Sequence, residues 1–159
     1  MSTAAAHIGI DPGLTGAIAV LDDAGSLLAL HDMPTQATTT GRNEISASAL
    51  ADLLRQYPNT PATIERVGAR PGEGAVGAFS FGHGFGTVLA VLATLSHPTR
   101  LVQPAVWKRW AAIPPGADKQ ASIGTAARMV PSAASHLTLR KHDGRADALL
   151  IGLYGLRHP

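Results

Sequence analysis

The 159-residue chain contains no cysteine, few aromatic side chains and no apolar run long enough to cross a membrane. Without cysteine it can form neither a disulfide framework nor a zinc–thiolate site. The longest apolar run, residues 86–95, is far shorter than the ~20 residues that a spanning helix requires. Residues 1–6 include no basic segment followed by an apolar core, so a secretory signal is not expected. We therefore expect a cytoplasmic protein with no membrane partner.

Charge is also sparse, whereas apolar content is sufficient for one core. Charged residues make up 15% of the chain, the net charge is +2 and the pI is about 9.4, which favours a polyanionic partner only weakly. Hydrophobic residues make up 45%, and a single domain of this length buries about two thirds of the surface that its unfolded chain exposes. We expect a single domain over residues 1–159.

Apolar and β-branched runs separated by turn residues predict strands, and runs with a 3.6-residue repeat predict helices. The first three strands are closely spaced, which is typical of an antiparallel meander. Segments 35–42 and 66–80 are polar or glycine-rich and are expected to be loops. The helix at 82–95 is so apolar that it belongs either in the core or at a dimer face. The expected strands are 7–10, 16–21, 27–32, 62–67 and 99–103, and the expected helices are 46–57, 82–95, 105–111, 118–130 and 144–157.

Four carboxylates stand where these elements begin or end. Asp11 ends the first strand, directly before a Pro-Gly turn, and Glu65 lies at the end of the fourth strand. Asp143 and Asp147 are four residues apart at the start of the last helix, so they share one face of it. Carboxylates gathered in this way repel one another, and a divalent cation relieves the repulsion. We expect the four to form a metal site.

Each of these residues also has an ordinary structural interpretation. An aspartate before Pro-Gly is commonly a turn residue, as Asp11 would be. Glu65 could be a solvated strand end, Asp143 a helix cap and Asp147 an exposed helix residue. The order of all four along the chain favours a functional cluster over four separate roles.

Basic and aromatic side chains lie in segments that the pattern places beside this cluster. Lys108 and Lys119 fall near the starts of two helices and could contact phosphates, or could belong to a solvated surface. Phe79 and Phe81 lie at the end of the glycine-rich segment, where they could stack on bases or pack into the core.

Taken together, these motifs resemble the RuvC-type Holliday junction resolvases of the RNase H-like superfamily, and the closing acidic motif resembles the bacteriophage-type branch. The similarity extends over residues 7–153. The segments that carry it are 8–13, 65–67, 71–74, 79–82 with Gly86, 104–108, 118–119 and 141–150.

The resemblance implies an α/β, RNase H-like domain with a central mixed five-stranded sheet, its first three strands antiparallel, flanked by helices. It also implies an endonuclease that resolves four-way DNA junctions by paired, metal-dependent hydrolysis of phosphodiesters. Two Mg²⁺ ions, for which Mn²⁺ can substitute, would be held by Asp11, Glu65, Asp143 and Asp147, with no small-molecule cofactor. Lys119 would stabilise the scissile phosphate.

The same resemblance implies how DNA is bound and where the protein acts. Paired nicks in a two-fold symmetric junction suit a homodimer, with the 82–95 helix at its interface. The setting would be a bacterial or phage-infected bacterial cell. The DNA-binding residues implied are Arg66, Arg70, Phe79, Phe81, Lys108, Lys119, Lys141 and Arg145.

The last acidic motif departs from the pattern of the cellular resolvases. Its two aspartates are four residues apart rather than three, and His142 directly precedes the first. A carboxylate suits magnesium better than an imidazole, which favours Asp143 as the ligand. His142 stays a candidate for a ligand or a general acid or base.

Three other functions fit parts of the sequence. The Asp-x-Gly-x-Thr pattern at residues 11–15 also occurs in the phosphate-binding turn of sugar kinases and actin-like ATPases, which need a second domain and a second such turn. A nuclease of the same fold could instead cut other branched DNA or RNA/DNA hybrids. A DNA-binding module without activity would not require every acidic position to be filled, as it is here.

Overall fold

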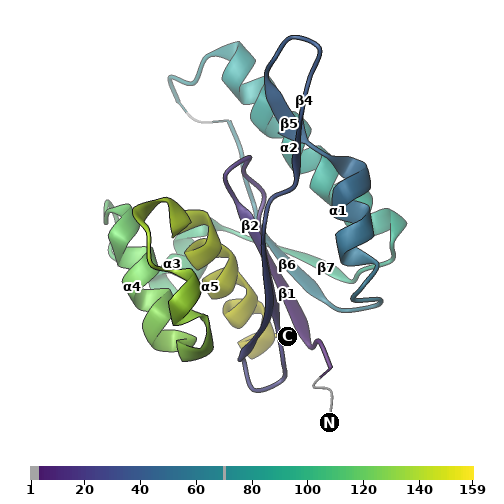
Figure 1. The fold of residues 1–159 in the computed structure, drawn as a ribbon. Helices are drawn as coiled ribbons and strands as arrows, with labels where there is room; N and C mark the ends of the chain where they lie inside the picture. Colours follow the sequence, from purple (N-terminus) through teal and green to yellow (C-terminus); the bar gives the residue numbers. More distant parts are fainter. Residues whose placement is uncertain (1–3, 70) are drawn as a thin grey trace.

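The structure, a computed structural model, describes residues 4–69 and 71–159 and is built on a five-stranded mixed sheet (Figure 1). The strand order is β3-β2-β1-β6-β7. β1, β2 and β3 form an antiparallel meander, and β6 and β7 continue the sheet parallel to β1. The expected sheet is confirmed. Its strands are β1 (His7–Asp11), β2 (Ala17–Leu21), β3 (Leu27–Asp32), β6 (Ala62–Glu65) and β7 (Thr99–Val102).

Helices cover both faces of the sheet, and the two-residue alternation of each strand divides the core between them. Ile18 and Val20 of β2 pack with the side of α1 and α2, while Ala19 and Leu21 face the side of α3, α4 and α5. The helices are α1 (Ala47–Leu54), α2 (Ala75–Thr94), α3 (Pro104–Trp110), α4 (Lys119–Met129) and α5 (Asp143–Arg157), with short 3-10 turns η1 (Pro131–His136) and η2 (Arg140–His142) before α5.

Helix α5 lies directly on β1 because glycines stand at the contact. A Cβ added at Gly9 would lie 2.1 Å from the carbonyl oxygen of Ala148, and one at Gly152 would lie 3.0 Å from the backbone nitrogen of Gly9. At the start of the helix, a Cβ at Gly144 would lie 2.3 Å from the carbonyl oxygen of Thr15. Backbone therefore meets backbone at both ends of the contact, which fixes α5 on the sheet.

Two segments differ from the sequence prediction. Residues 35–42 were expected to be a loop, but β4 (Thr35–Ala37) and β5 (Asn43–Ile45) form a separate antiparallel hairpin, closed by Gly41 at φ +79°. Helix α2 begins at Ala75 rather than at residue 82, so Phe79 lies in a helix rather than a loop. The glycines of α2 weaken its helical signal, but Gly84 brings the helix onto Ile45 of β5. The added turns, residues 75–81, are mostly exposed, so the contact of Gly84 does not account for them.

Helix α2 is also the most exposed apolar element. Its 20 residues are long and apolar enough to cross a membrane by length and composition alone, which the 10-residue run at 86–95 is not. Only 17% of its most apolar stretch is buried, on α1 and β5, and a single helix of this kind is weak support for a membrane span.

The glycine contact predicts a selective loss of stability. Gly9→Ala should lower the free energy of unfolding by about 3 kcal/mol, because its Cβ meets backbone that cannot rotate away. Gly124→Ala in α4 is the matched control: its Cβ would meet only the flexible end of Arg128, at 3.7 Å, and should raise stability by up to ~1 kcal/mol. Urea unfolding followed by circular dichroism measures both. Equal stabilities of Gly9→Ala and the unmodified protein would contradict this account of the contact.

Candidate active site

Asp11 and Glu65 lie side by side at one edge of the sheet. β1 and β6 are parallel neighbours with Ile10 opposite Ile64, so the next residue of each strand reaches the same edge. The chain turns sharply after Asp11, and the N–H of Gly13 donates to Asp11 Oδ1 at 3.1 Å. The turn thereby fixes the direction of the Asp11 carboxylate.

The first turns of α5 bring Asp143 and Asp147 to this edge. Gly144 seats the start of the helix on the turn that follows β1, and Gly152 seats its middle on the strand. Asp147 lies between these two contacts on the chain. The carboxylates of Asp147, Glu65 and Asp143 lie near enough to Asp11 for each of their charges to raise its pKa.

The four carboxylates therefore form one cluster of like charge. Burial, the largest cause, and the three neighbouring carboxylates raise the pKa of Asp11 to about 7, against the opposing Gly13 hydrogen bond. Burial also raises the pKa of Asp147 to about 6, with Glu65 and Asp143 adding to it, although a hydrogen bond with Ser122 and the charge of Lys108 lower it. Both shifts favour the protonated form, as expected where negative charge lacks sufficient positive charge nearby.

Three of the carboxylates have distinct environments. Glu65 Oε1 accepts a hydrogen bond of 2.9 Å from Nε1 of the fully buried Trp107. Asp143 Oδ2 lies 2.8 Å from Lys119 Nζ at the start of α4. Asp147 Oδ1 is buried, and within the described ranges nothing hydrogen-bonds to it. One oxygen of the cluster is thus buried and unpaired, at a cost in free energy.

The donor set fits a hard divalent cation. All four side chains offer oxygen, the ligand of Mg²⁺, and the unpaired Asp147 Oδ1 and the raised pKa values are what a cation would relieve. As the side chains stand, no three Asp, Glu or His residues of the described part are grouped closely enough to share an ion. A shared site therefore requires the carboxylates to draw together, and Asp143 would have to leave Lys119.

His142 and Arg145 lie on a different side of the α5 start. His142 is buried, and its Nδ1 accepts from the N–H of Leu139 at 3.3 Å. Burial lowers its pKa, and the charges acting on it are those of Arg145, Lys141, Asp32 and His136, not those of the cluster. Arg145 binds both oxygens of Asp32 on β3, at 2.7 and 2.8 Å. Of His142 and Asp143, Asp143 is the one that lies with the other carboxylates.

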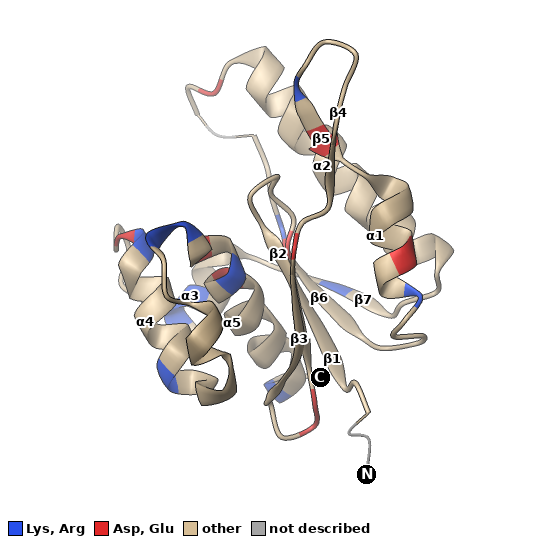
Figure 2. Ribbon diagram, viewed as in Figure 1, with Lys and Arg blue, Asp and Glu red and all other residues tan. Residues whose placement is uncertain are grey.

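The remaining predicted DNA-binding residues differ in exposure. Arg66 follows Glu65 and is exposed, as are Lys119 and Lys141. Figure 2 shows basic and acidic segments interleaved around the N-terminal ends of α4 and α5. Phe79 is 76% exposed and stacks on His83, whereas Phe81 is half-buried beside Glu73. Arg70 lies outside the described residues.

Two residues of the site were not identified from the sequence. Trp107 was noted only as part of a basic helix, although a buried indole N–H requires an acceptor and could have pointed to Glu65. Ser122, which hydrogen-bonds Asp147, carries no signal in the sequence because serines inside helices are common. Both hold carboxylates from the side of α3 and α4.

Comparison with known proteins supports the fold. No family model and no curated protein matches the chain. Among solved structures, RuvC of Thermus thermophilus in complex with a Holliday junction substrate matches with a TM-score of 0.65 and 16% identity, over 92% of this chain and 89% of that one. The chain has the RNase H-like fold of RuvC. A second structure of Thermus thermophilus RuvC matches with a TM-score of 0.63 and 18% identity, over 96% of both chains.

The raised pKa of Asp11 predicts how stability changes with pH. Its folded pKa of about 7 exceeds the ordinary aspartate value of 3.8, so its contribution to stability is fully present below about pH 4 and is lost as pH rises to about 7. Asn cannot ionise, so metal-free Asp11→Asn should gain stability relative to the unmodified protein from about pH 4 to about pH 7, and the difference should stay constant at higher pH. Urea unfolding in a chelating buffer measures the difference at each pH.

Asp23→Asn, in an exposed turn outside the cluster, is the matched control. Subtracting the unfolding free energies of the two variants at each pH separates the contribution of Asp11 from that of the histidines. Among these is His7, whose pKa is lowered to about 4 by burial. A difference for Asp11→Asn that stays constant or falls from about pH 4 to about pH 7 would be inconsistent with a buried carboxylate repelled by its neighbours.

Proposed function

We propose that the protein is a magnesium-dependent endonuclease that resolves four-way DNA junctions by paired nicks. The observation that carries this proposal is the cluster of Asp11, Glu65, Asp143 and Asp147 at one edge of a RuvC-like sheet. The first of the RuvC structures described above contains a Holliday junction substrate. A nuclease of this fold acting on other branched DNA or on RNA/DNA hybrids is the alternative.

The chemistry follows from the donor set. Asp11, Glu65, Asp143 and Asp147 would hold two Mg²⁺ ions, which supply an activated water for in-line attack and stabilise the leaving 3′ oxygen. Trp107 keeps one oxygen of Glu65 in place, and Gly13 does the same for Asp11. These hydrogen bonds limit how far the carboxylates must move when they draw together around the ions.

Lys119 has two roles in this proposal. In the structure its Nζ lies 2.8 Å from Asp143 Oδ2 and neutralises that carboxylate. When Asp143 turns to the metal, the same ammonium becomes available to the scissile phosphate. Lys108, whose charge already acts on Asp147, lies on the same side of the cluster.

DNA contacts extend outward from the cluster. We assign phosphate contacts to the exposed Arg66, Lys119 and Lys141. Arg145 would have to exchange Asp32 for a phosphate to take part. Phe79 is the aromatic side chain available to bases, because Phe81 is half-buried.

We further propose a homodimer through α2. The exposed positions of this helix include Gly82, Gly86, Ala90 and Ala93, small residues that allow a second helix to approach closely. Two copies related by a two-fold axis would match the symmetry of a four-way junction. They would also cover the apolar face that α2 leaves exposed.

Asp11→Asn tests the metal site. The variant should bind a synthetic mobile junction with unchanged affinity and cut it at least ~10³-fold more slowly in magnesium, because the amide cannot share a cation as a carboxylate does. Mapping nicks on four-way, three-way and RNA/DNA hybrid substrates identifies the preferred one. Retained cutting by Asp11→Asn would reject the assignment, and binding without cutting by the unmodified protein would indicate a non-catalytic module.

Phe79→Ala tests the role of the exposed ring. If the ring opens base pairs at the junction centre, its loss should reduce the cutting rate about tenfold and the affinity much less. The energy of stacking on the bases would then serve mainly to distort the bound junction into the shape that is cut. Phe81→Ala is the comparison, expected to lower the free energy of unfolding instead. Equal losses of cutting and affinity in Phe79→Ala would point to simple binding.

Ala90→Glu tests the dimer. A charge on the exposed face of α2 should leave the fold intact and shift the protein from dimer to monomer in sedimentation at micromolar concentration. Ala134→Glu, exposed on η1, should stay dimeric. An unmodified protein that sediments as a monomer and binds lipid vesicles would show that a membrane, not a second copy, covers α2.

A further inference from the structure

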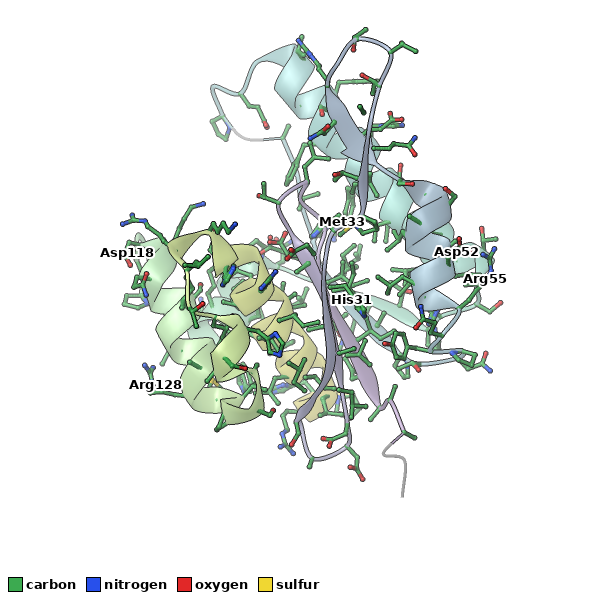
Figure 3. All side chains as sticks on the ribbon, viewed as in Figure 1. His31, Met33, Asp52, Arg55, Asp118 and Arg128 are labelled. Atoms are coloured by element: carbon green, nitrogen blue, oxygen red, sulfur yellow. The ribbon has the colours of Figure 1, made fainter. Side chains whose placement is uncertain are left out.

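A pocket of about 570 Å³ opens between α3 and the start of α4. Its walls are largely apolar, formed by short side chains and by the Pro114-Pro115-Gly116 turn that joins the two helices. Figure 3 shows Asp118 at the exposed start of α4, with Arg128 toward the other end of this helix. The lining residues that matter below are Ala105, Lys108, Arg109, Ile113, Ala117 and Ser122.

Two of these residues join the pocket to the carboxylate cluster. Ser122 is buried in the pocket wall and hydrogen-bonds Asp147. Lys108 also lines the pocket, and its charge lowers the pKa of Asp147. Ser122 and Lys108 therefore lie between the pocket and Asp147 of the cluster.

The pocket combines an apolar interior with cations at its edge. Ile113 contributes buried apolar surface, and Pro114 and Pro115 contribute rigid apolar walls. Lys108 and Arg109 bring two positive charges to the lining, against the single carboxylate of Asp118, which accepts from the N–H of Ala121 as the cap of α4. A flat, uncharged ring attached to a phosphate matches this arrangement, because the ring replaces water on the apolar walls and the phosphate lies beside the cations.

We propose that the pocket takes one unstacked nucleobase of the cut strand, next to the scissile phosphate, and so selects the nucleotide that flanks the nick. This inference rests on the proposed nuclease function and adds a specificity site to it. The volume exceeds that of a single base, so the base enters with room for its sugar. Lys108 and Arg109 can only donate hydrogen bonds, so the pocket favours the bases with carbonyl acceptors, guanine, thymine and cytosine, over adenine, whose acceptors are ring nitrogens alone.

The experiment compares cutting of junctions that carry an abasic site at each position flanking the nick. With the unmodified protein, one such position should lower the cutting rate about tenfold relative to the intact strand. Ala117→Phe and Ala105→Phe fill the pocket from opposite walls at exposed positions. In each variant the cutting rates of the intact and the abasic strand should be nearly equal, a ratio close to one. Gln120→Phe, exposed on α4 outside the pocket, should keep the tenfold ratio.

A second measurement needs no cutting. Asp11→Asn bound to a junction with 2-aminopurine at the sensitive position should show increased fluorescence as the base leaves the stack. Adding Ala117→Phe should remove the increase without removing binding.

The outcomes separate the two proposals. If the unmodified protein cuts junctions but no flanking position is sensitive, or if the pocket-filling variants keep the ratio, the pocket assignment is overturned and the nuclease stands. If it cuts no substrate in magnesium, the nuclease proposal is overturned and the pocket assignment falls with it.

Discussion

The close contact between α5 and β1 is the constraint on which the rest of the structure depends. Glycine at Gly9, Gly144 and Gly152 lets the helix backbone lie on the strand and on the turn after it. This contact brings Asp147, which lies between Gly144 and Gly152 on the chain, to the edge where β1 and β6 end. The fold and the candidate site thus share one packing requirement, and a methyl group at the contact would disturb both.

The cluster that results is held in an electrostatically unfavourable state. Burial and mutual repulsion raise the pKa of Asp11 and Asp147, and one oxygen of Asp147 is left unpaired. Trp107 donates a hydrogen bond to Glu65, and Lys119 forms an ion pair with Asp143. A site arranged in this way has free energy to gain from cations, because they remove repulsion that the protein has not itself neutralised.

The surroundings of the cluster divide the molecule into two sides. On one side, α2 exposes an apolar face and the ring of Phe79, which suits contact with another chain and with bases. On the other, α3 and α4 supply Lys108, Lys119 and Ser122 around an apolar pocket. The carboxylate cluster at the sheet edge therefore lies between the exposed apolar face of α2 and the pocket of α3 and α4, which the proposals above assign to dimerisation and to the cut strand.

The sequence by itself determined the strand meander, the helices behind it and the order of the four carboxylates, because period-two and 3.6-residue patterns and Pro-Gly turns are local signals. It missed the β4–β5 hairpin, which is formed by backbone pairing of two short polar segments, and the early start of α2, where glycines weaken the local helical signal. Only the tertiary structure decided that Asp143 rather than His142 joins the cluster, that Trp107 and Ser122 hold it, and that Arg145 is paired with Asp32. These depend on contacts between residues distant in sequence, and the direction of a side chain across such a contact is set by the packing of whole elements.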